Sequence, residues 1–151
     1  MLNWARNQNL KRVQKLIAVG GPLDLESASI RLKSGISRLY DLRINKILRS
    51  WYPQANVKPL MTVYEIDKHF TAQKHGFKDR EHYYSACSPI NFLDEIQIPQ
   101  HFVIAENDPL IDIDHYRKLK SSPLRHLIIT EGGGHIGYGD WMAKLITSIL
   151  K

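Results

Sequence analysis

Short apolar runs alternate with amphipathic stretches along the chain, and this alternation predicts an α/β protein. Residues 16–19, 102–105 and 127–130 are apolar runs of the length that forms buried strands. Residues 112–120 and 141–150 repeat apolar side chains at three- and four-residue steps, which predicts helices. Strands that alternate with helices indicate a parallel sheet with flanking helices.

The region between the first two predicted strands is expected to be helical. Residues 30–51 form the clearest helix, because apolar residues recur there with helical spacing. These residues are Ile36, Leu39, Tyr40, Ile47, Leu48 and Trp51. Shorter helices are expected over residues 60–70 and 79–86, and residues 3–15 are expected to be the end of a helix. Asp140 is the expected N-cap of the C-terminal helix.

The length and composition limit the possible classes of protein. A chain of 151 residues fits one domain, and a hydrophobic share of 43% excludes a disordered chain. No apolar run approaches the ~20 residues needed to cross a bilayer, and the N-terminus has no signal-peptide pattern. Cys87 is the only cysteine, so no internal disulfide can form. A reducing compartment is therefore expected, and the predicted localisation is cytoplasmic.

The chain is basic, with a formal net charge of +6. Such a charge raises the question of nucleic acid or an anionic membrane surface as a partner. The sequence contains no recognisable nucleic-acid-binding motif, so the charges are interpreted as solvated helix faces. Nucleic acid is not an expected partner, and a membrane surface is kept as the weaker alternative.

The candidate chemistry lies directly after two of the predicted strands. The apolar run at 127–130 is followed by the glycines 132–134 and then by His135. The run at 102–105 is followed by Asp108. Adjacent parallel strands would bring these two side chains to the same edge of the sheet. A histidine with a carboxylate beside it is the usual arrangement of a general base and its orienting acid.

Motifs that carry a family resemblance are spread over nearly the whole chain. They are Gly-Pro-Leu-Asp-Leu at 21–25, Phe-Thr-Ala-Gln-Lys-His-Gly-Phe at 70–77, Tyr-Tyr-Ser at 83–85, Ile-Pro at 98–99, Asn-Asp-Pro at 107–109 and Gly-Gly-His-Ile-Gly at 133–137. As a set they resemble the α/β-hydrolases that include the YheT-type esterases and the ABHD acylglycerol lipases. In α/β-hydrolases the triad runs in the chain order nucleophile, acid, histidine.

The resemblance implies that residues 1–151 are the C-terminal part of an α/β-hydrolase domain, with a helical cap over roughly residues 26–90. It assigns the catalytic acid to Asp108 and the catalytic histidine to His135. The Gly-x-Ser-x-Gly nucleophile motif of the family is absent, and Ser34 does not fit it. The implied substrate is a small-molecule acyl ester, no cofactor is implied, and the missing N-terminal half is the expected partner. The chain alone is expected to be inactive.

Several alternatives remain open from the sequence. Glu106 and Asp112 are the other carboxylates that could serve as the acid, although Asp112 also suits a helix N-cap. Cys87 has the right chain order for a nucleophile but lacks the surrounding elbow motif. A metal site could be imagined from Asp112, Asp114, His115 and His135, without an established ligand spacing. Beyond catalysis, the chain could be a non-catalytic module that binds a partner through an exposed sheet edge.

Overall fold

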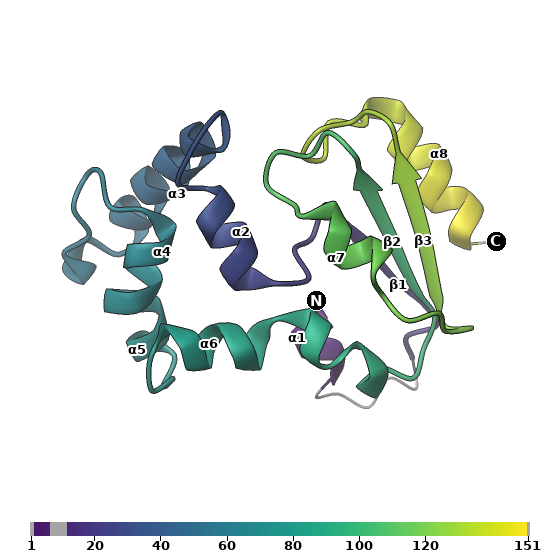
Figure 1. Cartoon of the computed structure of the whole chain (residues 1–151), viewed down its shortest axis with the longest axis horizontal. Coiled ribbons are helices and arrows are strands. Elements are labelled where there is room, and N and C mark those ends of the chain that lie inside the picture. The colour runs from purple at the N-terminus through teal and green to yellow at the C-terminus, as the bar shows by residue number, and fades with distance from the viewer. Residues whose placement is uncertain (1, 7–11, 151) are drawn as a thin grey trace. The chain divides into compact units, whose positions relative to one another are not determined.

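A computed structural model describes residues 2–6 and 12–150, and these divide into two units. Met1–Leu23 and Phe92–Lys151 form the first, which we call the sheet unit. Asp24–Asn91 forms the second, the helical unit. Figure 1 labels the strands in the sheet unit and helices in both units.

Within the described residues, three parallel strands make up the sheet (Figure 1). They are β1 (Leu16–Val19), β2 (Gln100–Ala105) and β3 (Arg125–Thr130), in that order across the sheet. In the register, Val19 pairs with Val103 and Ala105 pairs with Thr130. The expected α/β fold with parallel strands is therefore confirmed. The central strand is almost completely buried, because it has a neighbour on each side and its side chains form the core.

The sheet unit also contains α1 (Leu2–Arg6), α7 (Ile113–Arg117) and α8 (Gly139–Leu150). The helix expected over residues 3–15 is described only as α1, and residues 7–11 lie outside the described part of the chain. Because α8 begins at Gly139, Asp140 lies in its first turn, so the predicted N-cap was wrong.

Helices make up the helical unit. They are α2 (Leu25–Arg31), α3 (Ser37–Trp51), α4 (Val63–Ile66), a π-helical turn (Asp67–Thr71), α5 (Ala72–Lys74) and α6 (Arg80–Cys87). The single helix expected from residue 30 was wrong in its first turns. α2 ends at Arg31, and Gly35, with a left-handed φ of 60°, lies in the turn that separates it from α3. Thr62 begins α4 with a capping box, in which its hydroxyl and the Glu65 side chain bond each other's backbone N–H.

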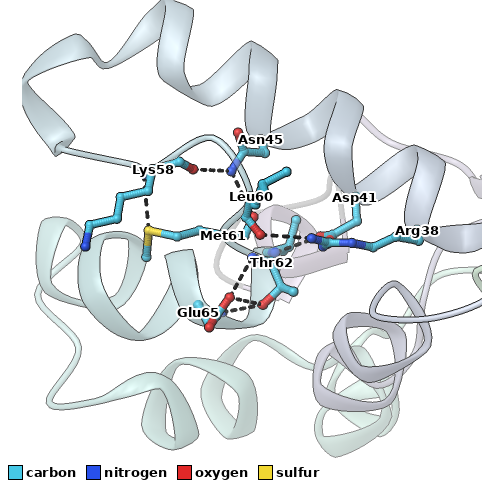
Figure 2. Close-up of polar contacts among 9 residues, drawn as sticks. Arg38, Asp41, Asn45, Lys58, Leu60, Met61, Thr62 and Glu65 are labelled. Carbon is cyan, nitrogen blue, oxygen red and sulfur yellow. Dashed lines mark hydrogen bonds and ion pairs between the residues drawn. The ribbon is translucent and has the colours of Figure 1, made fainter.

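The buried face of α3 is polar. Asp41 accepts a hydrogen bond from the Val63 backbone N–H at 2.7 Å and forms an ion pair with Arg38. The Asn45 side chain donates to the Lys58 and Met61 carbonyl oxygens, both at 2.8 Å. Figure 2 shows these side chains reaching from α3 to the loop before α4. The helix thus provides hydrogen-bond partners for the backbone of this loop and of the first residue of α4.

The outward face of α3 carries much of the apolar pattern that predicts the helix. Ile36, Leu39 and Trp51 are 68%, 66% and 70% exposed. The apolar spacing therefore identified the helix correctly but does not mark its buried face.

Two histidines stack across the sheet. His101 of β2 pairs with His126 of β3, and their rings lie 4.5 Å apart between centroids, only 15° from parallel. Burial lowers the pKa of His101, and the nearby His126 and Lys15 add to this effect because they disfavour a further positive charge.

We expect Asp41→Ala to lower the free energy of unfolding of the helical unit by about 1–3 kcal/mol, because it leaves the partly buried Val63 N–H without its acceptor. Urea unfolding followed by circular dichroism measures this change. Ser50→Ala on the exposed face of the same helix is the control and should have little effect. Equal stability of the two variants would contradict the structural role of Asp41.

The lowered pKa of His101 predicts a loss of stability in acid. Between the folded pKa and the unfolded value of 6.5, the unfolded chain binds the proton more readily. Stability contributed by neutral His101 is thus present above pH 6.5 and falls as the pH drops through the folded pKa. Thermal unfolding at pH 7.5 and 5.5 should show a smaller acid loss for His101→Gln than for the unsubstituted chain. If His101→Gln and the unsubstituted chain lose the same stability between pH 7.5 and pH 5.5, this effect is contradicted.

Candidate functional site

The carboxyl ends of all three strands meet at one edge of the sheet. Gly20 follows β1, Asp108 lies shortly after β2, and His135 lies shortly after β3. Gly20 has a φ of 59°, and a Cβ built on it would lie 3.5 Å from His135 Nδ1 and 3.6 Å from Asp108 Oδ2. The same Cβ would approach Ile136 Cγ2 to 3.0 Å. The end of β1 thus lies directly against the Asp108–His135 pair, and a Cβ at this position would crowd the Ile136 side chain.

Asp108 and His135 form the central contact of this edge. His135 Nδ1 lies 3.1 Å from Asp108 Oδ2, and Asp108 is only 5% exposed. A carboxylate oxygen accepts hydrogen bonds, so the contact favours the tautomer with a proton on Nδ1 and a lone pair on Nε2. Asp108 Oδ1 accepts from the Leu110 backbone N–H at 2.8 Å. The Asp108 carboxylate therefore stabilises the turn after β2 with one oxygen and contacts the histidine with the other.

Tyr116 supports the same edge from α7. Its side chain is buried, its ring packs against Phe102 at 5.6 Å between centroids, and its hydroxyl donates to the Gly21 carbonyl oxygen. Burial raises the pKa of Tyr116, and the Asp108 carboxylate adds to the increase. The hydroxyl therefore stays protonated and keeps its donor role.

The loop that carries His135 needs unusual backbone conformations. Gly133 has a φ of 132°, and a Cβ on it would lie 2.2 Å from the Tyr138 ring. The loop closes with a hydrogen bond of 2.7 Å from the Gly137 N–H to the Gly133 carbonyl oxygen. Ile136, next to the histidine, has a φ of 61°, which is strained for a β-branched residue. Such conformations persist only where the surrounding contacts hold them.

A further contact joins this loop to the one after β2. Asn107 Oδ1 accepts from the Gly134 backbone N–H at 2.9 Å, beside the Asp108–His135 contact. At the start of the loop, the Thr130 hydroxyl donates to the Gly132 carbonyl oxygen at 2.8 Å. Side chains therefore hold the loop at two points.

The other candidate residues have different surroundings. Glu106 is exposed and forms an ion pair with Arg117. It lies in the turn that follows β2, because the strand ends at Ala105. Asp112 caps α7 by accepting from the Asp114 backbone N–H at 3.1 Å. Cys87 is the last residue of α6 and so does not sit in a strand-to-helix elbow.

A metal centre finds no support in residues 2–6 and 12–150, where no three histidine, cysteine, aspartate or glutamate side chains are grouped as ligands. Over the same part of the chain, every helix is too short or too polar to cross a membrane.

Some contacts at this edge of the sheet could not be predicted from the sequence. The Tyr116–Gly21 hydrogen bond joins residues 95 positions apart, and the close approach of Gly20 to the pair depends on the sheet register. Asn107 belongs to the Asn-Asp-Pro motif, which from the sequence indicates only a turn. Its bond to Gly134 becomes visible only when the two loops are side by side.

Known proteins similar to this chain are esterases and lipases. The protein named "Putative esterase YheT" of Escherichia coli (strain K12) is 30% identical over 148 residues, which cover 89% of this chain and 44% of the relative. The medium-chain fatty acid ethyl ester synthase/esterase 2 of Saccharomyces cerevisiae is 32% identical over 95 residues, covering 59% of this chain and 21% of the relative. The monoacylglycerol lipase of the same yeast is 30% identical over 105 residues, covering 65% and 23%.

No family model matches the chain. The three relatives share the α/β-hydrolase family, and the parallel sheet with flanking helices agrees with part of that fold. The chain is therefore related to the α/β-hydrolases, among them the YheT-like esterases. It spans less than half the length of each of these relatives.

We expect Gly133→Ala to destabilise the sheet unit by about 1–3 kcal/mol, because alanine disfavours this φ and its Cβ meets the Tyr138 ring. Gly132→Ala is the matched control, since a Cβ there has nothing within 4 Å. Urea unfolding of both variants gives the comparison. The account of the loop fails if the two substitutions cost the same.

Proposed function

We propose that this chain supplies the acid and the histidine of a serine hydrolase that cleaves carboxylic acyl esters. The observation that carries the proposal is the 3.1 Å contact between His135 Nδ1 and Asp108 Oδ2 at the carboxyl ends of parallel strands. The esterases and lipases among the relatives support the same reaction class. The chain order of acid and then histidine also fits the family.

In the proposed mechanism, a serine outside this chain attacks the ester carbonyl. His135 Nε2 accepts the serine proton and then gives it to the leaving alcohol. Asp108 keeps the imidazole in the productive tautomer and stabilises its positive charge. Water then attacks the acyl-enzyme with His135 acting again as the base, which restores the serine. The steps require no cofactor.

The proposed partner of this chain is a polypeptide that carries Gly-x-Ser-x-Gly, which this sequence does not contain. The sheet offers a place for it. Among the described residues, β1 pairs on one side only, with β2, so its other edge has backbone groups available for a further strand. We assign the helical unit the role of a cap, over roughly residues 26–90, with an acyl ester as the substrate.

A second candidate is a non-catalytic module that binds another protein through the β1 edge. The one-sided pairing of β1 and the missing nucleophile motif favour it. The two candidates differ in whether the DNA upstream of this coding sequence encodes Gly-x-Ser-x-Gly. If such a frame exists, the hydrolase is supported, and if it does not, the module is.

The proposal predicts that this chain alone has no appreciable esterase activity, because it lacks the attacking side chain. Hydrolysis of a short p-nitrophenyl ester should appear when the upstream-encoded segment is added in trans or fused. In the active combination, His135→Ala should lower kcat by at least about 10³-fold, and Asp108→Asn by about 10²–10⁴-fold.

Glu106→Gln is the matched control for Asp108→Asn, because Glu106 lies two residues away and pairs with Arg117. It should leave kcat unchanged. Esterase activity of the purified chain alone, through Cys87 or one of its serines, would overturn the proposal. Loss of activity in Glu106→Gln with full activity in Asp108→Asn would show that the acid is misassigned.

A further inference from the structure

The loop after β3 departs from the register of the sheet just before it reaches His135. Ala105 pairs with Thr130, so an unbroken register would place Asn107 opposite Gly132 and Asp108 opposite Gly133. Instead, Asn107 contacts Gly134 and Asp108 contacts His135. The loop therefore contains extra backbone between the strand and the histidine, and the sheet alone does not determine where His135 lies.

The backbone leading to His135 has little stiffness of its own. Residues 132–134 are all glycine, and glycine restricts the backbone less than any other residue. The hydrogen bond from the Gly134 N–H to Asn107 Oδ1, at 2.9 Å, fixes the Gly133–Gly134 peptide, one residue before the histidine. The consecutive residues Asn107 and Asp108 of the loop after β2 thus hold the consecutive residues Gly134 and His135 of the loop after β3.

We infer that Asn107 is a positioning residue that places His135 against Asp108. Its side chain contacts the loop backbone rather than the reacting atoms, so its effect reaches the substrate only through His135. The turn after β2 does not need this side chain, because the Asp108 carboxylate bonds the Leu110 N–H there. Asn107 is exposed, so its substitution should disturb the histidine more than the core. The catalytic consequence of this inference rests on the proposed function.

The test uses the 151-residue chain labelled with ¹⁵N, whose histidine ring signals report the tautomer. His135→Gln assigns the signal of interest. We expect His135 to hold its proton on Nδ1 at pH 8 in the unsubstituted chain. Asn107→Ala should remove the predominance of this form, and Asn107→Asp, which keeps an acceptor oxygen, should restore it. Asn91→Ala is the control, because its side chain bonds the Ser85 carbonyl oxygen within the helical unit.

Circular dichroism of each variant confirms that the chain is folded. If the His135 tautomer is unchanged in Asn107→Ala, the inference is overturned, whatever the activity of the protein. If Asn107→Asp fails to restore the tautomer while folding normally, the acceptor role is also overturned. These measurements need no nucleophile, so they stand apart from the proposed function.

In a combination that hydrolyses esters, Asn107→Ala should lower kcat by about 10–10²-fold, since a small displacement of a catalytic group has effects of this size. KM should stay near that of the unsubstituted protein, because Asn107 has no part in holding the ester. A raised KM with unchanged kcat would contradict a positioning role. A shifted tautomer in a chain that never gains esterase activity would leave the positioning role intact and count against the proposed function.

Discussion

The parallel direction of the three strands is the constraint on which the candidate site depends. Because the strands run the same way, their carboxyl ends lie at one edge, and the residues that follow them converge. Gly20, Asp108 and His135 come from distant parts of the sequence and still meet there. The register matters as much as the direction, since a slip of one residue would turn every side chain of the strand to the opposite face. The buried β2 opposes such a slip, because it packs its side chains on both faces.

The strands and the Asp108–His135 contact could be predicted because their signals are local. An apolar run marks each strand, and the residues just after it must lie at the strand's end. The face of α3 could not be predicted in this way. Periodicity shows which positions are apolar, but the buried Asp41 and Asn45 face a loop whose backbone groups need partners. Contacts such as Tyr116 with Gly21 depend on the complete fold and leave no pattern in the sequence.

The helix α3 reverses the usual arrangement of an amphipathic helix, because its buried face is polar and apolar residues lie on its exposed face. Asp41 and Asn45 hold the loop before α4 in place, and Leu39 and Trp51 of the same helix remain exposed. Hydrogen bonds give a loop a defined position because they are directional, whereas apolar contacts are adaptable. A unit built in this way combines a fixed internal structure with an apolar surface. Under the proposed function, such a surface suits a substrate with an acyl chain, since burial of apolar area favours its binding.

The histidine loop shows why one contact is insufficient to fix both the position and the orientation of a side chain. A single hydrogen bond between Asp108 and His135 limits the distance between two atoms, but the imidazole can still pivot about that contact. Gly132 to Gly134 would permit the pivot, because glycine allows many backbone conformations. The second bond, from the Gly134 N–H to Asn107, holds the backbone from which the ring extends. Position and orientation are then set together, and under the proposed function His135 needs both to face a serine at hydrogen-bonding distance.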